Sequence, residues 1–251
     1  MPSFLLDPGT VAFVGAGPGD PGLLTLHALR ALQMADVVIH DRLASDDILA
    51  HTRPAATRIS VGKEGFGPSV PQTRANALLV AHARAGARVV RLKGGDPAIF
   101  ARLDEEIAAL DAAGIAWQIV PGITAASAAA ARLGQGLTQR GRNAGVRLVT
   151  GHDAKGFADQ DWRALAAPGA IAAIYMGKRA ARFIQGRLMM HGAAPTTPVT
   201  LVENASRADE RVLPATLATL PEAAAGLDGP AILMLGLAPR AARATAKEAL
   251  A

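Results

Sequence analysis

The sequence predicts an α/β protein of two α/β domains with a cleft between them, the second domain containing a mixed sheet. Short β-branched runs alternate with helical patterns in the first half, which is typical of βαβ units and a parallel sheet. The second half begins a new series of short apolar runs, and a polar tip in ASRADERVLPATL indicates an antiparallel pair. We place the domains at residues 1–123 and 124–245 and expect a frayed tail over residues 246–251.

Five strands are expected in the first domain, at residues 11–17, 36–41, 57–62, 88–96 and 117–124. Helices are expected between them, at residues 23–35, after Ser45, and at residues 72–86 and 99–113. Ser45 suits an N-cap, whereas Gly86 and Gly114 suit helix ends. The second domain is expected to have helices at residues 125–133 and 179–191, and strands at residues 145–152, 170–177, 198–206, 211–220 and 229–236.

Composition and charge exclude several classes of protein. Half of the 251 residues are apolar and 19% are charged, so the chain is neither disordered nor a coiled coil. There is no cysteine, which excludes disulfides and thiolate chemistry, and His152 and His191 lack the spacing of a metal site. Basic residues outnumber acidic ones by 26 to 21 without a dense run, which fits either arginine on solvated faces or a substrate rich in negative charge, and does not favour a nucleic acid.

The sequence also bears on location. No uncharged apolar stretch approaches the roughly 20 residues that span a bilayer, so no membrane contact is expected. The first residues, MPSFLLDPGT, lack the basic and apolar regions of a signal peptide. We therefore expect a cytoplasmic protein.

The glycine-rich turn in VAFVGAGPGDPGLL departs from a dinucleotide-binding fingerprint. That fingerprint is G-x-G-x-x-G, but here the third glycine comes one residue early and Asp20 takes its place. A carboxylate there would repel a pyrophosphate, and Pro18 and Pro21 lack N–H donors. Asp20 is instead expected to cap the next helix through the N–H of Leu23. Asp41, about 20 residues further on, suits a ribose-binding acid, so a nicotinamide-dependent oxidoreductase stays as an alternative.

A second turn stands in VVRLKGGDPAIFARLDEE, where a strand ends in Gly94, Gly95 and Asp96. A helix is expected to follow, starting with Ile99 and Phe100 packed near the turn. Ligands of open α/β sheets bind outside the carboxyl ends of the strands, and paired glycines there expose backbone groups that can bond an adenine or a carboxylate. Taken alone, the motif also fits a simple strand-to-helix turn.

Several motifs stand in a fixed order along the chain: VGAGPGDPGLLTL, DRL, VGK with SVPQ, VVRLKGGDP, VPGITAA, LTQR, VTGH and YMG. In this order they resemble the uroporphyrinogen-III C-methyltransferases, within the wider tetrapyrrole methyltransferases, from Val11 to about Pro239. The resemblance implies an S-adenosyl-L-methionine-dependent enzyme that methylates two pyrrole carbons of uroporphyrinogen III, giving precorrin-2 by way of precorrin-1. It also implies a homodimer, with cofactor and substrate in the cleft between the domains.

The resemblance assigns site residues by their motif positions. Cofactor contacts are implied for Pro18, Gly94, Gly95, Asp96, Ile99, Thr124, Ala125, Met176, Ala205 and Ala231. The substrate is rich in carboxylates and needs fixed cations, and the substrate-binding positions are Lys63, Arg102, Arg140 and Met176. The pyrrole carbon is itself the nucleophile, so the chain must align it with the methyl group and then remove a proton. For that step the candidates are Arg102, Glu105 and Asp41, with Arg102 favoured and Glu105 fixing it through an i,i+3 contact.

One segment departs from the family pattern. Where the family has FGRGGEE this chain has FARLDEE, so Ala101, Leu103 and Asp104 replace glycines. This departure leaves another precorrin methyltransferase, and a non-catalytic tetrapyrrole-binding protein, as alternatives. No dehydrogenase–chelatase module like that of fused siroheme synthases is visible, so methylation alone is expected, and the product suits cobalamin, siroheme or haem d1 synthesis.

Overall fold

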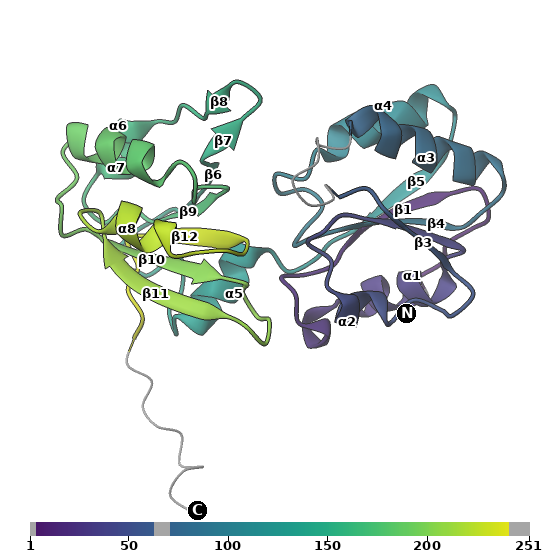
Figure 1. Cartoon of the computed structure of the whole chain (residues 1–251), viewed down its shortest axis with the longest axis horizontal. Helices are drawn as coiled ribbons and strands as arrows, with labels where there is room; N and C mark the ends of the chain where they lie inside the picture. The colour runs from purple at the N-terminus through teal and green to yellow at the C-terminus, as the bar shows by residue number, and fades with distance from the viewer. Residues whose placement is uncertain (1–3, 63–70, 241–251) are drawn as a thin grey trace, which may run out of the picture. The chain divides into compact units, whose positions relative to one another are not determined.

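The computed structural model describes residues 4–62 and 71–240 (Figure 1). The chain divides into two compact units, Met1–Thr124 and Ala125–Ala251, each with its own sheet. Two of the predictions, substrate binding by Lys63 and the tail at residues 246–251, lie outside the described residues.

The first unit is built on a five-stranded parallel sheet in the order β3-β2-β4-β1-β5. Its strands are β1 (Val11–Gly15), β2 (Val37–His40), β3 (Thr57–Ser60), β4 (Val89–Lys93) and β5 (Trp117–Val120). All residues of β1 and β4 are buried, as expected for central strands that are covered on both faces. The expected parallel sheet of βαβ units is confirmed.

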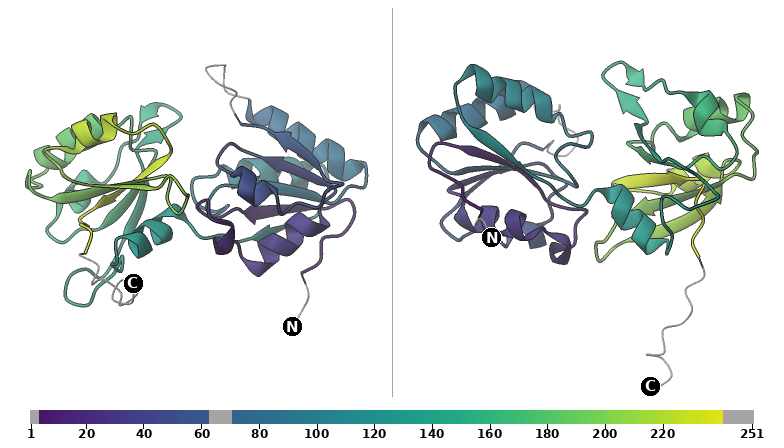
Figure 2. Two further views of the ribbon diagram at one scale, coloured as in Figure 1. Left: turned by 60° about the horizontal axis from the view of Figure 1, so that its bottom comes forward. Right: turned by 180° about the vertical axis from the view of Figure 1, so that it is seen from behind.

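Helices cover both faces of this sheet, as Figure 1 and the right-hand view of Figure 2 show. They are α1 (Leu26–Met34) and α2 (Asp46–Leu49) on one face, and α3 (Gln72–Arg84) and α4 (Leu103–Ala112) on the other. Side chains alternate along β1 because successive residues of a strand face opposite sides. Ala12 and Val14 pack in the core with α1 and α2, whereas Val11 and Phe13 pack in the core with α3 and α4.

The strand order creates a switch point between β1 and β4. From β1 the chain passes β4 to reach β2, and from β4 it passes β1 to reach β5. In sheets of this kind the ligand binds outside the carboxyl ends of the strands, at the switch point. The loops that follow β1, β4 and β5 therefore start where a ligand site is expected.

The second unit contains a five-stranded sheet in the order β11-β10-β12-β9-β6 and a short hairpin. Its strands are β6 (Arg147–Thr150), β9 (Ala172–Tyr175), β10 (Pro198–Glu203), β11 (Arg211–Thr216) and β12 (Ala231–Leu235), and the hairpin is β7 (His152–Asp153) with β8 (Gly156–Phe157). β6 and β9 are parallel, whereas β12 is antiparallel to β9 and β10, and β10 is antiparallel to β11. The mixed sheet and the antiparallel pair predicted from ASRADERVLPATL are confirmed.

Helices also cover both faces of the second sheet. α5 (Ala125–Arg132) packs through alanines on one face, and α6 (Trp162–Ala166), α7 (Ala181–Met190) and α8 (Leu220–Ala225) pack on the other. Within residues 4–62 and 71–240, no helix has the length and apolar composition that crossing a bilayer requires.

The helix predicted at residues 99–113 is present, but it starts at Leu103, so its predicted start was wrong. Phe100 and Arg102 lie in the left-handed region, with φ of 51° and 54°, and this breaks the helical path. Phe100, which was expected to pack near the turn, is 43% exposed.

The Asp20 side chain accepts from a different backbone N–H group than the predicted one, that of Leu23. Its Oδ1 accepts from the N–H of Gly22 at 2.7 Å within a short 3-10 turn, and the N–H of Leu23 donates to the backbone carbonyl of Asp20 instead. α1 starts after this turn, and its cap is Thr25, whose Oγ1 accepts from the N–H of Ala28 at 3.1 Å. The prediction that Asp20 caps through Leu23 was therefore wrong, because the chain makes an extra turn before the helix.

Three other local predictions are confirmed. Ser45 caps α2, with its Oγ accepting from the N–H of Ile48 at 3.4 Å. Gly86 and Gly114 follow α3 and α4 with φ of 80° and 68°, the conformation that ends a helix at glycine.

Candidate active site

Three loops meet at the carboxyl edge of the parallel sheet. Gly17 and Gly95 exchange two backbone hydrogen bonds, of 3.1 and 2.7 Å, which join the loops after β1 and β4. The loop after β5 packs against both, since a Cβ on Gly122 would lie 2.2 Å from the carbonyl oxygen of Gly95 and 2.8 Å from Cα of Gly15. Glycine is required here because three backbones pack together without side chains between them.

Five backbone N–H groups in and beside the glycine-rich turn are already bonded within the protein. Internal acceptors take the N–H groups of Ala16, Gly17, Gly22, Leu23 and Leu24. Pro18 and Pro21 have no N–H to offer, and α1 does not begin until Leu26. A pyrophosphate needs free N–H groups and a helix N-terminus, so this geometry argues against the dinucleotide-binding alternative.

Six of the predicted cofactor residues lie in these loops: Pro18, Gly94, Gly95, Asp96, Ile99 and Thr124. Asp96 ties two loops together, because its Oδ1 accepts from the N–H of Ala98 at 2.8 Å and its Oδ2 from the N–H of Gly122 at 3.0 Å. Gly94 packs against the loop after β2, where a Cβ would lie 2.5 Å from Cβ of Leu43. The structure thus brings these residues to one edge of the sheet, and their contact with a cofactor stays a prediction.

Arg102 and Glu105 form a bidentate ion pair at the start of α4. Nε of Arg102 donates to Oε1 of Glu105 at 2.8 Å, and Nη2 donates to Oε2 at 2.6 Å. The hydrogen bond with Glu105 raises the pKa of Arg102, and the hydrogen bond from Arg102 lowers the pKa of Glu105. Both side chains are more than half exposed and stay charged at neutral pH, so Arg102 can bind an anion. The predicted i,i+3 contact is confirmed.

Asp41 lies close to the end of β4. It follows β2, the neighbour of β4 in the sheet, and its Oδ1 accepts from the N–H of Leu43 at 2.9 Å. The Asp41 carboxylate is one of the charges that raise the pKa of Lys93, the last residue of β4. A carboxylate at this edge can accept a proton, and the assignment of that role to Asp41 stays a prediction.

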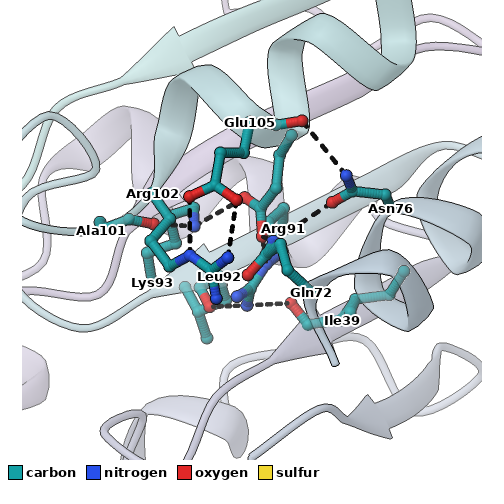
Figure 3. A network of polar contacts seen from close by, with 10 residues as sticks. Ile39, Gln72, Asn76, Arg91, Leu92, Lys93, Ala101, Arg102 and Glu105 are labelled. Carbon is teal, nitrogen blue, oxygen red and sulfur yellow. Dashed lines mark hydrogen bonds and ion pairs between the residues drawn. The ribbon is translucent and has the colours of Figure 1, made fainter. Parts of the chain in front are cut away.

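A buried charged cluster next to the Arg102–Glu105 pair was missed by the sequence analysis (Figure 3). Glu106 is fully buried on α4, where its Oε1 accepts from Nε of Arg91 at 2.9 Å and from Nε2 of Gln72 at 2.8 Å. Its Oε2 lies 2.6 Å from Nζ of Lys93, which also donates to the backbone carbonyl of Ala101 at 2.6 Å. Burial lowers the pKa of Lys93 and the Arg91 cation lowers it further, against the raising effect of Glu106.

The sequence contains a signal for this cluster. Arg91 and Lys93 occupy alternate positions of an otherwise apolar strand, and strands of a parallel sheet are buried on both faces. Two cations on one face of such a strand require a buried partner of opposite charge. Glu106 is that partner, one helical turn before the buried Leu110 on α4.

The other cofactor candidates gather at one edge of the mixed sheet. β9 and β10 run in the same direction and β12 runs opposite to them, so Met176, Ala205 and Ala231 share an edge. Met176 is half exposed, with a left-handed φ of 52°. Ala125 lies nearby, because the N–H that follows it in α5 donates to the hydroxyl of Tyr175 at 3.3 Å.

A buried carboxylate fixes part of this edge. Glu203, the last residue of β10, accepts from two backbone N–H groups of the loop before β12 and pairs with Nη1 of Arg211 at 3.1 Å. Asn204 and Ser206 have left-handed φ values of 49° and 66° and flank Ala205. Ala205 thus lies two residues after a carboxylate that is held by three contacts, and the sequence analysis did not single out Glu203.

Arg140 belongs to the second unit, and its role in substrate binding stays a prediction. Arg140 lies exposed in the loop between α5 and β6, and among the described residues of this unit no hydrogen bond or ion pair joins it to Met176, Ala205 or Ala231. His152 has its Nδ1 3.0 Å from the carbonyl oxygen of Met176, and its ring packs edge-on against Phe157. In the part of the chain that the structure describes, no group of three His, Cys, Asp or Glu side chains is placed to hold a metal ion.

Comparison with known proteins links this geometry to one family. The sequence profile of the Tetrapyrrole (Corrin/Porphyrin) Methylases matches residues 10–221. Siroheme synthase 3 of Aeromonas hydrophila is 51% identical over 228 residues, which cover 91% of this chain and 49% of that protein. Siroheme synthase of Edwardsiella ictaluri is 50% identical over 231 residues, which cover 92% of this chain and 50% of that protein. The chain spans about half the length of the curated relatives that it matches.

Solved structures with the same fold include two methyltransferases. The uroporphyrin-III C-methyl transferase of Thermus thermophilus, complexed with S-adenyl homocysteine, has a TM-score of 0.78 and 38% identity, covering 90% of this chain and 97% of that chain. The cobalamin biosynthetic enzyme cobalt precorrin-4 methyltransferase has a TM-score of 0.81 and 28% identity, covering 91% of this chain and 95% of that chain. The same backbone thus serves enzymes named for different tetrapyrroles, so side chains must decide the substrate.

Proposed function

Because the chain belongs to the tetrapyrrole (corrin/porphyrin) methylases, we propose that it is an S-adenosyl-L-methionine-dependent C-methyltransferase of uroporphyrinogen III. It methylates two pyrrole carbons and gives precorrin-2 by way of precorrin-1. The observation that carries the proposal is the sequence identity to the Thermus thermophilus uroporphyrin-III C-methyl transferase, which extends over nearly the whole of that chain. A precorrin substrate is the second candidate, since cobalt precorrin-4 methyltransferase shares the fold at lower identity.

The junction of the three loops suits a cofactor without phosphate groups. Five backbone N–H groups of its glycine-rich turn are engaged and the Asp20 carboxylate stands in the turn, so a pyrophosphate would meet few donors and a negative charge. When bound, S-adenosyl-L-methionine supplies an electrophilic methyl group on a sulfonium. We assign contacts with it to Pro18, Gly94, Gly95, Asp96, Ile99 and Thr124 in the first unit, and to Ala125, Met176, Ala205 and Ala231 in the second.

Arg102 holds a substrate carboxylate in this proposal. Its pKa is raised by the hydrogen bond with Glu105, so it remains a cation, and a guanidinium binds a carboxylate through two parallel hydrogen bonds. Glu105 occupies Nε and Nη2 and so fixes the direction of the group. Lys63, Arg140 and Met176 are further substrate contacts. Asp41 is the carboxylate that accepts the proton from the methylated ring carbon, because Arg102 has no free site for a proton while it is charged.

Calorimetric titration with S-adenosyl-homocysteine, with NADH as the control, tests the cofactor class. We expect micromolar binding of S-adenosyl-homocysteine and none of NADH. An anaerobic assay with uroporphyrinogen III then tests the substrate, with a precorrin as the competing substrate. Binding of NADH alone would overturn the proposal in favour of the oxidoreductase. Methylation of the precorrin alone would show that the substrate is a precorrin and not uroporphyrinogen III.

Replacing Arg102 tests its role. We expect Arg102→Ala to lower turnover by about 100-fold or more, because the reacting carbon is no longer aligned, while the affinity for S-adenosyl-homocysteine stays near that of the wild type. Steady-state assays and calorimetry on the same preparation measure both. Turnover at the wild-type rate in this variant would remove Arg102 from the mechanism.

The proposal includes a homodimer in the cytoplasm. Light scattering after size exclusion should give twice the chain mass of 25.7 kDa. A monomer that is fully active would contradict the dimer.

A further inference from the structure

The turn that presents Arg102 is held in a backbone conformation that its own residues disfavour. Phe100 and Arg102 both have left-handed φ values, which non-glycine residues seldom adopt because Cβ then crowds the backbone. Ala101 lies between them. Strained residues of this kind persist only where the surrounding structure determines them.

The departure of FARLDEE from the family pattern does not explain the strain. The residues that replace glycines are Ala101, Leu103 and Asp104, and none of them has a positive φ. Leu103 and Asp104 are the first two residues of α4, and Leu103 packs against the core between α3 and α4. The left-handed positions fall on Phe and Arg, which this chain shares with the family pattern, so the turn itself needs another support.

That support comes from β4. Nζ of Lys93 donates to the carbonyl oxygen of Ala101 at 2.6 Å, in the middle of the strained turn, as Figure 3 shows. Lys93 is 2% exposed, and its Nζ also lies 2.6 Å from Oε2 of Glu106, with which it forms an ion pair. Arg91 and Gln72 hold Glu106 in turn, so the turn is tied through one ammonium group to β4, α3 and α4.

We propose that Lys93 is a positioning residue for methyl transfer: it fixes the turn at residues 100–102 through the carbonyl of Ala101 and thereby aims Arg102. This inference rests on the proposed function, because the catalytic importance of Arg102 belongs to it. Lys93 itself is buried and donates to groups of the protein, so it acts through Arg102 and not on the substrate. Its replacement should therefore change turnover more than cofactor affinity.

Arg91 offers a matched control on the same strand. Like Lys93 it is a buried cation that pairs with Glu106, but its other hydrogen bonds go to the carbonyls of Ile39 and Leu92 and none goes to the turn. Lys93→Met and Arg91→Met thus each remove one buried cation beside Glu106, and only Lys93→Met removes the bond to Ala101. Both variants are expected to lose stability, so each assay is scaled to the number of sites that bind S-adenosyl-homocysteine.

The first measurement does not depend on activity. Trypsin cuts after arginine when the chain opens locally, so the fragment that begins at Leu103 reports opening of the turn. We expect Lys93→Met to release this fragment at least about tenfold faster than the wild type, relative to cleavage after Arg84 in the same unit, and Arg91→Met to change the ratio much less. Equal ratios in the two variants would overturn the claim that Lys93 fixes the turn.

The second measurement is a double-mutant cycle with Arg102→Ala. Lys93→Met should lower kcat about 10- to 100-fold with little change in the KM for S-adenosyl-L-methionine, and Arg91→Met should lower kcat far less, because it leaves the bond from Lys93 to Ala101 in place. If Lys93 acts through Arg102, adding Lys93→Met to Arg102→Ala lowers turnover no further. The proposal would be overturned if the double variant lost turnover by the product of the two single-variant losses. It would also be overturned if Lys93→Met had the turnover of the wild type.

Two further arms separate the possible failures. The chain has no cysteine, so Lys93→Cys can be aminoethylated at a single site under denaturing conditions and refolded, which restores a lysine-like ammonium. Recovery of turnover supports positioning by that group, and recovery of stability without turnover contradicts it. If the wild type transfers no methyl group to uroporphyrinogen III, the proposed function fails, and the trypsin ratios alone decide whether Lys93 fixes the turn.

Discussion

Adding one methyl group at Gly122 should disrupt the junction of the three loops. In Gly122→Ala the new Cβ would lie 2.2 Å from the carbonyl oxygen of Gly95 and 2.8 Å from Cα of Gly15. Both neighbours are backbone, so no side chain can rotate away. Gly122 has no left-handed φ, so the whole effect comes from the contact and not from the conformation of residue 122.

The size of the effect follows from the distances. Ordinary contact of a Cβ begins at 3.4 Å, so the separation from the Gly95 oxygen must grow by about 1.2 Å. That carbonyl also accepts from the N–H of Gly17 at 3.1 Å, a bond that a shift of this size would break. Overpacking costs about 1–3 kcal/mol and a lost hydrogen bond costs about 1 kcal/mol. We expect the free energy of unfolding to fall by about 2–4 kcal/mol.

Urea unfolding and calorimetry with S-adenosyl-homocysteine measure the two consequences, stability and cofactor affinity. Gly186→Ala is the control, since Gly186 lies exposed in α7 with no atom within 4 Å of an added Cβ. The free energy of unfolding of Gly186→Ala should rise by up to about 1 kcal/mol, because alanine has a higher helix propensity than glycine. The close approach of the three loops is refuted if the free energy of unfolding of Gly122→Ala lies within about 0.5 kcal/mol of that of the wild type and its affinity for S-adenosyl-homocysteine is unchanged.

Two other predictions concern buried charges. Glu203→Gln should lower the free energy of unfolding by about 2–3 kcal/mol, because an amide cannot accept from both the backbone N–H groups and Arg211. The same variant should weaken the binding of S-adenosyl-homocysteine near Ala205. An unchanged urea midpoint together with an unchanged affinity would contradict this prediction. Lys93 has a pKa lowered from 10.5, so between its folded pKa and 10.5 the unfolded chain binds more protons, and stability rises with pH. The difference in unfolding free energy between the wild type and Lys93→Met should therefore shift in favour of the wild type as the pH rises toward 10.5, and a flat or falling difference would contradict the lowered pKa.

Local patterns in the sequence predicted most of the fold. Strands and helices were identified from apolar periodicity, and Ser45 and Gly114 were placed correctly because capping depends on a few neighbouring residues. The start of α4 could not be predicted in this way. The left-handed φ of Phe100 and Arg102 is held by a hydrogen bond from Lys93, which lies on another element.

The candidate site was predicted through motif order rather than geometry. The pairing of Arg102 with Glu105 follows from their spacing, and the structure has it. The burial of Lys93 against Glu106 depends on which helix covers β4, and the spacing of residues along the sequence does not determine that. The same holds for Gly122, whose need for glycine arises from a carbonyl on a different loop.

The sequence by itself determined what each segment becomes and which residues resemble a methyltransferase site. Those properties depend on side chains a few positions apart, whose interactions the chain encodes directly. The tertiary structure alone decided which loops touch, which charges are buried together, and how Arg102 is held. Those properties arise when β1, β4 and β5 align in one sheet and bring residues far apart in the chain into contact, where sterics and the cost of burying charge select the arrangement.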